Sequence, residues 1–230
     1  MKTVVGAIVQ ARISSERFPG KVLFEVEGKP VLQYLLERLE RCRGLNTTIV
    51  ATSKEPADMA IAELCQQRGV PCYRGELEDV ASRFKAVSSE YKLDAFVRVN
   101  GDSPLLDQSL IEKGINLYLS GEYDLVTNCI PRSYPKGQTI EILRAETYRQ
   151  AYALFEEDDD LEHVTHYYYT HLEDFRIQNF SYAESINHIR LCVDTHEDMD
   201  RFAAIISCMD RPHLEYNLED ILRIYRSIGQ

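Results

Sequence analysis

Short apolar runs alternate with longer segments whose apolar residues recur every three or four positions. In the first half of the chain, the short runs cover residues 4–9, 47–51, 70–73 and 94–99. The helix-length segments between them cover residues 30–39, 56–69, 78–90 and a stretch that starts at residue 107. This alternation predicts an α/β fold with a largely parallel, buried sheet flanked by helices. In such open sheets, ligands bind beyond the carboxyl ends of the strands, so we expect the functional residues in the loops that follow them.

The second half of the chain has a less regular pattern. It predicts two helices within residues 145–171, and strands at residues 124–127, 139–143, 176–180 and 189–193. Two further helices close the chain, and Thr195 with Asp198 three residues later resembles a capping box at the start of the first one. Since no linker, repeat or low-complexity segment interrupts the pattern, we expect residues 1–230 to form a single domain.

Histidines and tyrosines crowd one segment of this second half. His163 and His166 share it, but neither an HExxH motif nor cysteine partners accompany them, so the signal for zinc is weak. An apolar stripe at helical spacing runs through the same segment and is expected to pack inward; it consists of Leu161, Val164, Tyr168 and Leu172. The acidic run at residues 156–160 is expected to be a solvated turn.

The composition restricts the partners of the chain. A formal net charge of -11 repels polyanions, which argues against nucleic acid and against an anionic membrane surface. No apolar run approaches the length of a membrane span, and residues 4–9 lack the cleavage site of a signal peptide, so we expect a cytoplasmic protein. The six cysteines are scattered without a CxxC pair, and we expect them to be reduced core residues.

Cationic and hydroxyl side chains are concentrated in the loop after the first predicted strand. Arg12, Arg17 and Lys21 lie there together with Ser14 and Ser15. In an acidic chain, such a concentration at a ligand-binding edge suits a triphosphate, because arginine forms forked hydrogen bonds and lysine supplies a point charge. The loop is neither a Walker P-loop nor a dinucleotide fingerprint, since GxxxxGK[ST] and GxGxxG are both absent. Composition alone leaves a solvated basic loop as the alternative.

Two aspartates also follow predicted strands. Asp102 lies in the turn just after Asn100, and Asp194 follows the run at residues 189–193. Nucleotidyl transfer needs a divalent ion on the phosphate oxygens, and Mg²⁺ takes one or two carboxylates with water and phosphate completing its shell. Asp102 and Asp194 are therefore candidate Mg²⁺ ligands. The structural alternative is that each aspartate only serves a turn or a helix N-terminus.

Several short motifs are spaced along the whole chain. They are Gln10-Ala11-Arg12 with Ser15, Arg17 and Pro19-Gly20-Lys21; Ala51-Thr52-Ser53; Arg74-Gly75 with Asp79 and Arg83-Phe84; Gly101-Asp102 before Pro104; Tyr134-Pro135 with Gly137; Glu162-His163-Val164-Thr165; and Val193-Asp194-Thr195 with Glu197-Asp198. Together they resemble the motifs of the spore-coat polysaccharide cytidylyltransferases, relatives of CMP-KDO synthetase and the CMP-nonulosonate synthetases. The resemblance implies a Rossmann-like nucleotide-diphospho-sugar transferase fold, often in a homodimer.

The resemblance also implies roles for individual residues. Arg12 and Lys21 would bind the phosphates of CTP and form the catalytic set with Asp102, while Asp102 and Asp194 would hold Mg²⁺. Further contacts to the nucleotide would come from Gln10, Ala11, Ser14, Ser15, Arg17, Ser53, Arg74, Asp79, Ser82 and Asn100. The acceptor would contact Tyr134, Lys136, Gly137, Glu141, Glu162 and His163.

The chain departs from the family pattern at the phosphate loop and on the acceptor side. Where relatives often have Arg-Met-Gly-Ser-Thr-Arg, this chain has Ile-Ser-Ser-Glu between Arg12 and Arg17, so Glu16 must point away or weaken phosphate binding. Ser103 stands where a cysteine is common, and Gln138-Thr139 replaces a small apolar and acidic pair. These departures leave the identity of the acceptor open.

The resemblance implies transfer of CMP from CTP to a hydroxyl of an acid sugar of the 3-deoxy-ulosonic or nonulosonic type. Pyrophosphate would be released, and the product would serve surface polysaccharide or glycan synthesis. Two alternatives stay open. One is the same transfer to a sugar phosphate or a phosphonate, and the other is a nucleotide-binding protein without catalysis.

Overall fold

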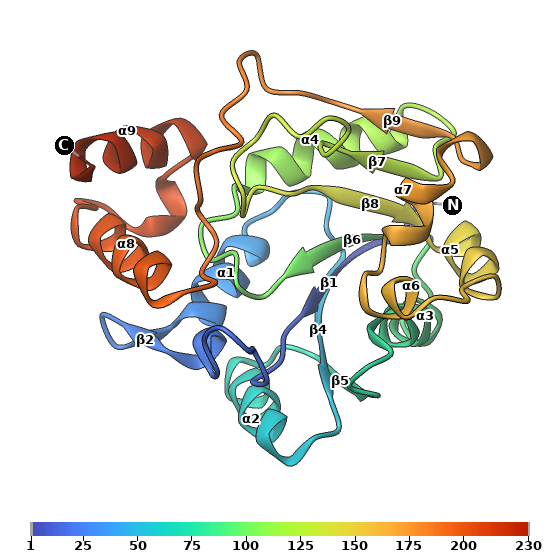
Figure 1. The fold of residues 1–230 in the computed structure, drawn as a ribbon, viewed down its shortest axis with the longest axis horizontal. Coiled ribbons are helices and arrows are strands. Elements are labelled where there is room, and N and C mark those ends of the chain that lie inside the picture. The colour runs from blue at the N-terminus through green and yellow to red at the C-terminus, as the bar shows by residue number, and fades with distance from the viewer. Residues whose placement is uncertain (1, 230) are drawn as a thin grey trace.

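The computed structural model describes residues 2–229, and within them seven strands form one sheet in the order β5-β4-β1-β6-β8-β7-β9 (Figure 1). Its parallel strands are β1 (Val5–Gln10), β4 (Thr47–Ser53), β5 (Cys72–Gly75) and β6 (Ala95–Asn100). The strand β8 (Glu141–Arg144) is antiparallel to β6 and to β7 (Leu125–Thr127), and β7 pairs in parallel with β9 (Ile177–Asn179). Because β1 is buried on both faces, its sequence is apolar almost throughout.

Helices cover both faces of this sheet. On one face, Ala7 and Val9 of β1 share an apolar cluster with α1 (Val31–Glu40), α2 (Met59–Arg68), α4 (Gln108–Leu119), α8 (His196–Ser207) and α9 (Leu218–Ile228). On the other face, Ile8 packs with α3 (Val80–Glu90), α5 (Ala145–Tyr152) and α7 (His166–Thr170). The predicted α/β architecture is confirmed. None of the helices in the described part of the chain has the length and apolarity needed to cross a bilayer.

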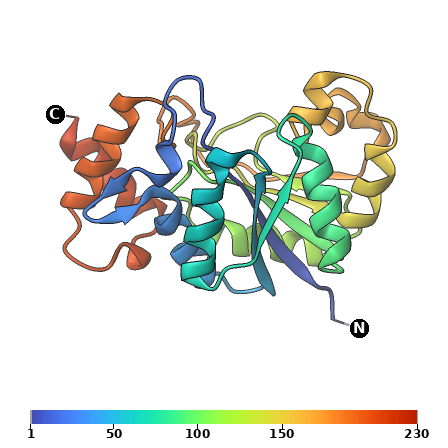
Figure 2. The ribbon, with the colours of Figure 1, turned by 90° about the horizontal axis from the view of Figure 1, so that it is seen from below.

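The C-terminal helices form one end of the molecule, opposite the segment 145–171 (Figure 2). They lie beside the hairpin of β2 (Glu25–Val26) and β3 (Lys29–Pro30). Arg38 of α1 ties this end together, because its fully buried guanidinium donates hydrogen bonds to three main-chain carbonyls. The acceptors are Leu106 at 2.8 Å, His213 at 2.5 Å and Tyr216 at 2.7 Å. The arginine thus ties α1 to the chain at Leu106 and to the short 3-10 helix at His213–Glu215, where the His213 carbonyl also accepts the Tyr216 N–H at 3.4 Å.

Two predicted helix ends are confirmed. Gly69 ends α2 in the left-handed conformation, with φ of 66°. Thr195 and Asp198 form a complete capping box at the start of α8.

Predictions for the second half needed correction. Residues 189–193, all of them described, form no strand, and Arg190 makes only an isolated bridge to Lys136. Residues 145–171 contain one more helix than the two that were predicted: α6 (Asp158–Glu162) lies between α5 and α7. The acidic run is therefore not simply a turn: Asp158, Asp159 and Asp160 fill the first turn of α6, where the helix dipole favours carboxylates, and Glu157 is its N-cap residue.

Some side chains are also buried differently from the prediction. Asp160 of the acidic run is buried and pairs with His166 at 2.8 Å. Leu172 is 43% exposed and does not continue the inward stripe. Cys208 is exposed, so it is not a core residue, whereas Cys42 and Cys65 are buried as expected.

Candidate active site

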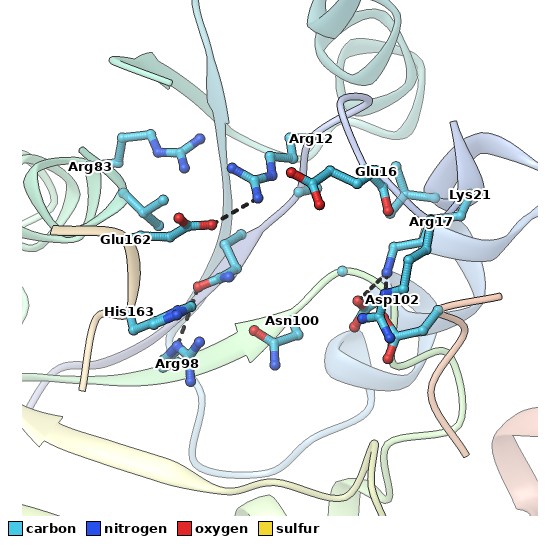
Figure 3. A pocket seen from close by; sticks show the side chains of 17 residues that line it. Arg12, Glu16, Arg17, Lys21, Arg83, Arg98, Asn100, Asp102, Glu162 and His163 are labelled. Atoms are coloured by element: carbon cyan, nitrogen blue, oxygen red, sulfur yellow. Dashed lines mark hydrogen bonds and ion pairs between the residues drawn. The ribbon is translucent and has the colours of Figure 1, made fainter. Parts of the chain in front are cut away.

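A cavity of about 510 Å³ opens at the carboxyl ends of β1 and β6 (Figure 3). Gln10 ends β1 and pairs in register with Asn100, the last residue of β6, and both line the cavity. The loops that follow pass close to each other, since the Gly101 N–H donates to the Gln10 carbonyl at 2.8 Å. A Cβ on Gly101 would lie 3.0 Å from the Cβ of Ala11, so glycine permits this approach. The cavity lies where the sheet was predicted to bind its ligand.

The cationic loop between β1 and Lys21 is anchored on two sides. Asp58, which is 1% exposed, accepts the Ile13 N–H at 2.7 Å and the hydroxyl of Ser53 at the end of β4. Phe18 is buried and stacks on His196 of α8, with ring centroids 4.0 Å apart. These contacts hold the loop in a defined conformation above the sheet edge.

Lys21 lies between the two aspartates that the sequence indicated as metal ligands. Its Nζ donates to Oδ2 of Asp102 at 2.6 Å and to Oδ1 of Asp194 at 2.8 Å. Burial alone would lower the pKa of Lys21, but the two carboxylates outweigh burial and the pKa is raised. Burial raises the pKa of Asp194, yet Lys21, Arg17 and Arg190 together lower it. The lysine ammonium therefore joins both carboxylates in the way that a single bound cation would.

Main-chain hydrogen bonds bring Asp194 to Asp102. The Val193 N–H donates to the carbonyl of Asp102 at 2.8 Å, which fixes the two segments side by side. Arg190 then donates to Oδ2 of Asp194 at 2.9 Å, leaving Oδ1 toward Lys21. Asp194 is thus oriented from both sides.

The loop 134–137 supports this segment from behind and does not line the cavity. Lys136 exchanges main-chain hydrogen bonds with Ile189 and Leu191, at 2.9 and 2.8 Å. Gly137 has φ of 91°, and a Cβ there would lie 2.6 Å from the backbone nitrogen of Cys192. Tyr134 is 3% exposed, with Phe180 and Tyr182 as its aromatic neighbours. Lys136 and Gly137 therefore support the segment that leads to Asp194, whereas Tyr134 packs in the aromatic cluster next to them. Contact of these three residues with an acceptor stays a prediction.

The other predicted acceptor residues lie on the far side of the cavity from Lys21. Glu162 and His163 line the cavity, because the chain leaves the helical conformation at His163 after α6. Glu162 accepts a hydrogen bond from Nη2 of Arg12 at 2.9 Å (Figure 3). Glu16 also lines the cavity, so it does not point away from the predicted phosphate site.

Glu141 lies behind the cavity wall. It is 2% exposed and accepts hydrogen bonds from Arg98 at 2.6 Å and from the hydroxyl of Thr165 at 2.9 Å. Burial raises the pKa of Glu141, but the charge of Arg98 and these hydrogen bonds outweigh burial, and the pKa is lowered. Arg98 in turn lines the cavity and donates to the Gln10 side chain at 3.3 Å. Glu141 thus positions Arg98 and is hidden from a ligand in the cavity.

Only some of the residues predicted to bind the nucleotide line the cavity. Those that line the cavity are Gln10, Ala11, Arg12, Ser15, Arg17, Lys21 and Asn100. Those that do not are Ser14, Ser53, Arg74, Asp79 and Ser82. Arg74 donates to the carbonyls of Ser53 and Glu55, and Asp79 caps α3 by accepting the N–H of Ser82. Contact of these residues with a nucleotide stays a prediction.

Comparison with known proteins identifies the family. A model of the cytidylyltransferase family matches residues 6–224. The chain belongs to this family. The resemblance read from the motifs is confirmed.

Some relatives of this cytidylyltransferase align with most of the chain, and others align with about half of it. An uncharacterized protein of Methanocaldococcus jannaschii is 35% identical over 193 residues, which are 83% of this chain and 78% of that protein. The spore coat polysaccharide biosynthesis protein SpsF of Bacillus subtilis is 29% identical over 209 residues, 86% of this chain and 84% of that protein. A 3-deoxy-manno-octulosonate cytidylyltransferase of Geobacter sulfurreducens is 34% identical over 113 residues, 48% of this chain and 44% of that enzyme. A solved cytidylyltransferase from Leptospira borgpetersenii matches with a TM-score of 0.94 at 26% identity, covering 99% of this chain and 96% of that one.

Sequence reasoning assigned no role to four residues that shape this cytidylyltransferase site, although one of them, Arg83, belongs to the motifs that carry the family resemblance. Asp58 and Arg190 position the loop and Asp194, while Arg83 and Arg98 line the cavity. Two of them carry a signal in the sequence. Arg98 is a charge inside a buried strand, and Arg83 is a cation on the same face of α3 as the buried Val80, Phe84 and Val87. A charge on a buried face needs a partner or a function.

The donor set fits a magnesium ion. Asp102 and Asp194 offer hard carboxylate oxygens from two loops, and both already contact one cation, the ammonium of Lys21. Within residues 2–229, no group of three or more histidines, cysteines or carboxylates could hold a metal ion alone. Mg²⁺ commonly takes only one or two carboxylates and completes its shell with water and substrate phosphates.

Proposed function

We propose that this cytidylyltransferase transfers CMP from CTP to a hydroxyl of an acid sugar of the 3-deoxy-ulosonic or nonulosonic type. One observation carries the proposal: Arg12, Arg17 and Lys21 converge with Asp102 and Asp194 in one cavity at the carboxyl edge of the sheet. The names of two relatives support the acceptor class. One is a 3-deoxy-manno-octulosonate cytidylyltransferase, and SpsF is named for spore coat polysaccharide biosynthesis.

In the proposed reaction, the acceptor oxygen forms a bond to the α-phosphorus of CTP while the bond from that phosphorus to the β-bridging oxygen breaks. Pyrophosphate leaves with the electron pair of the broken bond, and the acceptor hydroxyl loses its proton to water. Arg12 and Arg17 would hold the triphosphate through forked hydrogen bonds, and Lys21 would neutralise charge on the departing pyrophosphate. Positioning and charge stabilisation would therefore supply most of the rate, without a covalent enzyme intermediate.

The ion pairs of the structure must rearrange for these roles. Arg12 has to exchange Glu162 for phosphate, and Lys21 has to leave Asp102 and Asp194. The two aspartates would then hold Mg²⁺, which supplies charge neutralisation on the phosphate oxygens when bound. Glu162, once released, would lie with His163 on the side of the cavity where the acceptor is proposed to bind.

The test is pyrophosphate release with each of CTP, UTP, ATP and GTP against a panel of acid sugars, sugar phosphates and phosphonates. We expect turnover only with CTP and an acid sugar. Asp102→Asn and Asp194→Asn should each lower kcat by about 100-fold or more, the size seen when one preorganised electrostatic group is removed. Full activity in Asp102→Asn would contradict the metal assignment. Binding of CTP without turnover on any acceptor would favour a non-catalytic nucleotide-binding protein.

The proposal treats residues 1–230 as one catalytic domain of a cytoplasmic homodimer. The family match over residues 6–224 supports the single domain. Light scattering coupled to size-exclusion chromatography measures the assembly, and a mass near 26.5 kDa would contradict the dimer.

A further inference from the structure

Arg83 projects from the first turns of α3 into the wall of the cavity (Figure 3). Its side chain is 2% exposed, and both Nε and Nη1 are buried without a hydrogen-bond partner. Buried polar groups in folded proteins almost always have partners, because leaving a charged donor unsatisfied in the interior is costly. The position of Arg83 therefore needs a reason outside the stability of the free protein.

The neighbouring cations show how unusual this is. Arg12 pairs with Glu162 at 2.9 Å, Arg17 with Asp194 at 3.3 Å, and Arg98 with Glu141 at 2.6 Å. Among the cations that line the cavity within residues 2–229, Arg83 alone has no ion pair. Burial and then the nearby charge of Arg12 lower the pKa of Arg83 to about 10, which still leaves it charged at neutral pH.

The stem of Arg83 is held in place. Gly75 at the end of β5 lies directly against it, and a Cβ on Gly75 would stand only 2.6 Å from the Cγ of Arg83. The absence of a side chain at position 75 therefore leaves the space that the arginine stem fills. A buried, positioned and unpartnered guanidinium is preorganised for a group that arrives with a ligand.

We infer that Arg83 is a binding residue for a substrate oxyanion, a carboxylate or a phosphate group, at the end of the cavity that Arg12 and Glu162 share. The inference rests on the proposed function and deepens it. A guanidinium presents forked donors that match either kind of oxyanion, and a negative charge there would also relieve the repulsion between Arg83 and Arg12. The carboxylate of Glu162 on Arg12 shows that this end of the cavity accepts an oxyanion.

Arg83→Met tests the inference, because the variant should lose affinity for a ligand without losing thermal stability. Binding of CTP and of inorganic pyrophosphate is measured by isothermal titration calorimetry without acceptor, KM is measured for 3-deoxy-manno-octulosonate, and the melting temperature is measured without ligands. If a phosphate group is the partner, the dissociation constants rise by about 10- to 100-fold, the range for a charge-assisted hydrogen-bonded pair. If the carboxylate of the acid sugar is the partner, CTP binding is unchanged and KM rises by a similar factor. In both cases the melting temperature is unchanged or higher, because the variant loses an unsatisfied buried charge.

Two variants separate binding from general damage. Arg83→Lys keeps the charge without the fork and should recover part of the affinity, while Gly75→Ala keeps the arginine but displaces its stem and should weaken the same ligand. Arg226→Met on the exposed side of α9 removes an equal charge far from the cavity and should change neither readout.

The inference is overturned if Arg83→Met binds CTP and the acid sugar as the wild type does. It is equally overturned if the variant melts at a lower temperature or does not fold, since Arg83 would then be a structural residue. The proposed function fails separately, when wild-type protein releases no pyrophosphate with any acid sugar; CTP and pyrophosphate binding then decide the role of Arg83 alone. A wild type that binds none of these probes overturns both.

Discussion

Replacing Lys21 with methionine tests two proposed roles of this residue: it neutralises charge on the departing pyrophosphate, and its ammonium occupies the position between the two aspartates where a metal ion would bind. Methionine keeps the length of the side chain but removes the ammonium that joins Asp102 and Asp194. The variant should lose turnover, because nothing then neutralises charge on the departing pyrophosphate. It should also gain affinity for Mg²⁺ in the absence of nucleotide, because the carboxylates lose the cation that competes for the same oxygens.

The loss of folding stability expected for Lys21→Met follows from the burial of the three side chains. The side chains of Lys21, Asp102 and Asp194 are 10%, 23% and 19% exposed, so the cluster is largely shielded from water. Removing one partner of a buried ion pair costs about 3–5 kcal/mol, and the partial exposure favours the lower end. About 3 kcal/mol in a chain of this size lowers the melting temperature by roughly 6–12 °C. Mg²⁺ at ten times its dissociation constant should restore about 1.4 kcal/mol, or roughly 3–6 °C.

Differential scanning fluorimetry over a Mg²⁺ titration measures both quantities. The wild type without CTP should show little response to Mg²⁺, the variant a clear rise, and the double variant with Asp102→Asn no rise. Lys2→Met at an exposed position before β1 controls for loss of a lysine. A Lys21→Met protein that is as stable as the wild type, or that does not respond to Mg²⁺, would refute the view that the ammonium occupies the cation position of the site.

Three further outcomes follow from other contacts. Arg38→Met should lower the melting temperature by roughly 6–12 °C, because three hydrogen bonds from one buried guanidinium to main-chain carbonyls are lost; an unchanged value would show that the C-terminal end does not need these bonds. Glu162→Gln should tighten CTP binding by up to about fivefold in calorimetry, since a half-exposed ion pair is worth at most ~1 kcal/mol, whereas weaker binding would contradict competition for Arg12. Burial raises the pKa of Glu37, but bonds from Lys29, Gln33 and His213 outweigh it and bring the pKa from 4.5 to about 2. The unfolded chain therefore binds this proton more tightly, and the stability that Glu37 contributes is complete above about pH 4.5 and is lost toward pH 2. Melting temperatures across that window should fall less steeply for Glu37→Gln, and parallel curves would count against the assignment.

The first half of the fold was predictable because its information is local. The strands β1, β4, β5 and β6 each coincide with a short, mostly apolar run, and the helices between them have their own periodic faces and end signals, as Gly69 shows for α2. The two-residue strands β2 and β3 have no apolar run and were not predicted. Residues 189–193 have the same apolar character but form no strand, because they pair with the irregular loop around Pro135 and Gly137 instead of with a strand. Apolar content alone does not specify the partner, so this part of the pattern was misread.

The site was predictable where its residues follow strands. Lys21 and Asp102 come together because they follow the parallel neighbours β1 and β6, whereas Asp194 follows no strand and reaches the same edge through the hydrogen bond from Val193 to Asp102. The motif residues Tyr134 and Gly137 were assigned to the acceptor by the family resemblance, and in the structure Gly137 packs against the segment that leads to Asp194, while Tyr134 packs on Phe180 and Tyr182. A motif records that residues are needed together, but it does not record which of them touch the ligand.

The charge arrangement of the cavity shows why the basic loop alone gave an incomplete picture. Four cations line the cavity apart from Arg98, namely Arg12, Arg17, Lys21 and Arg83, and so do four carboxylates, Glu16, Asp102, Glu162 and Asp194. The loop is therefore not a general anion-binding site, because carboxylates, most of them from distant parts of the chain, already neutralise most of its positive charge. A ligand has to offer each released partner a replacement, which a triphosphate with its divalent ion does and a simple anion does not. Among the cavity cations in the described part of the chain, Arg83 alone has no ion pair, so an oxyanion that binds there would not have to displace a carboxylate.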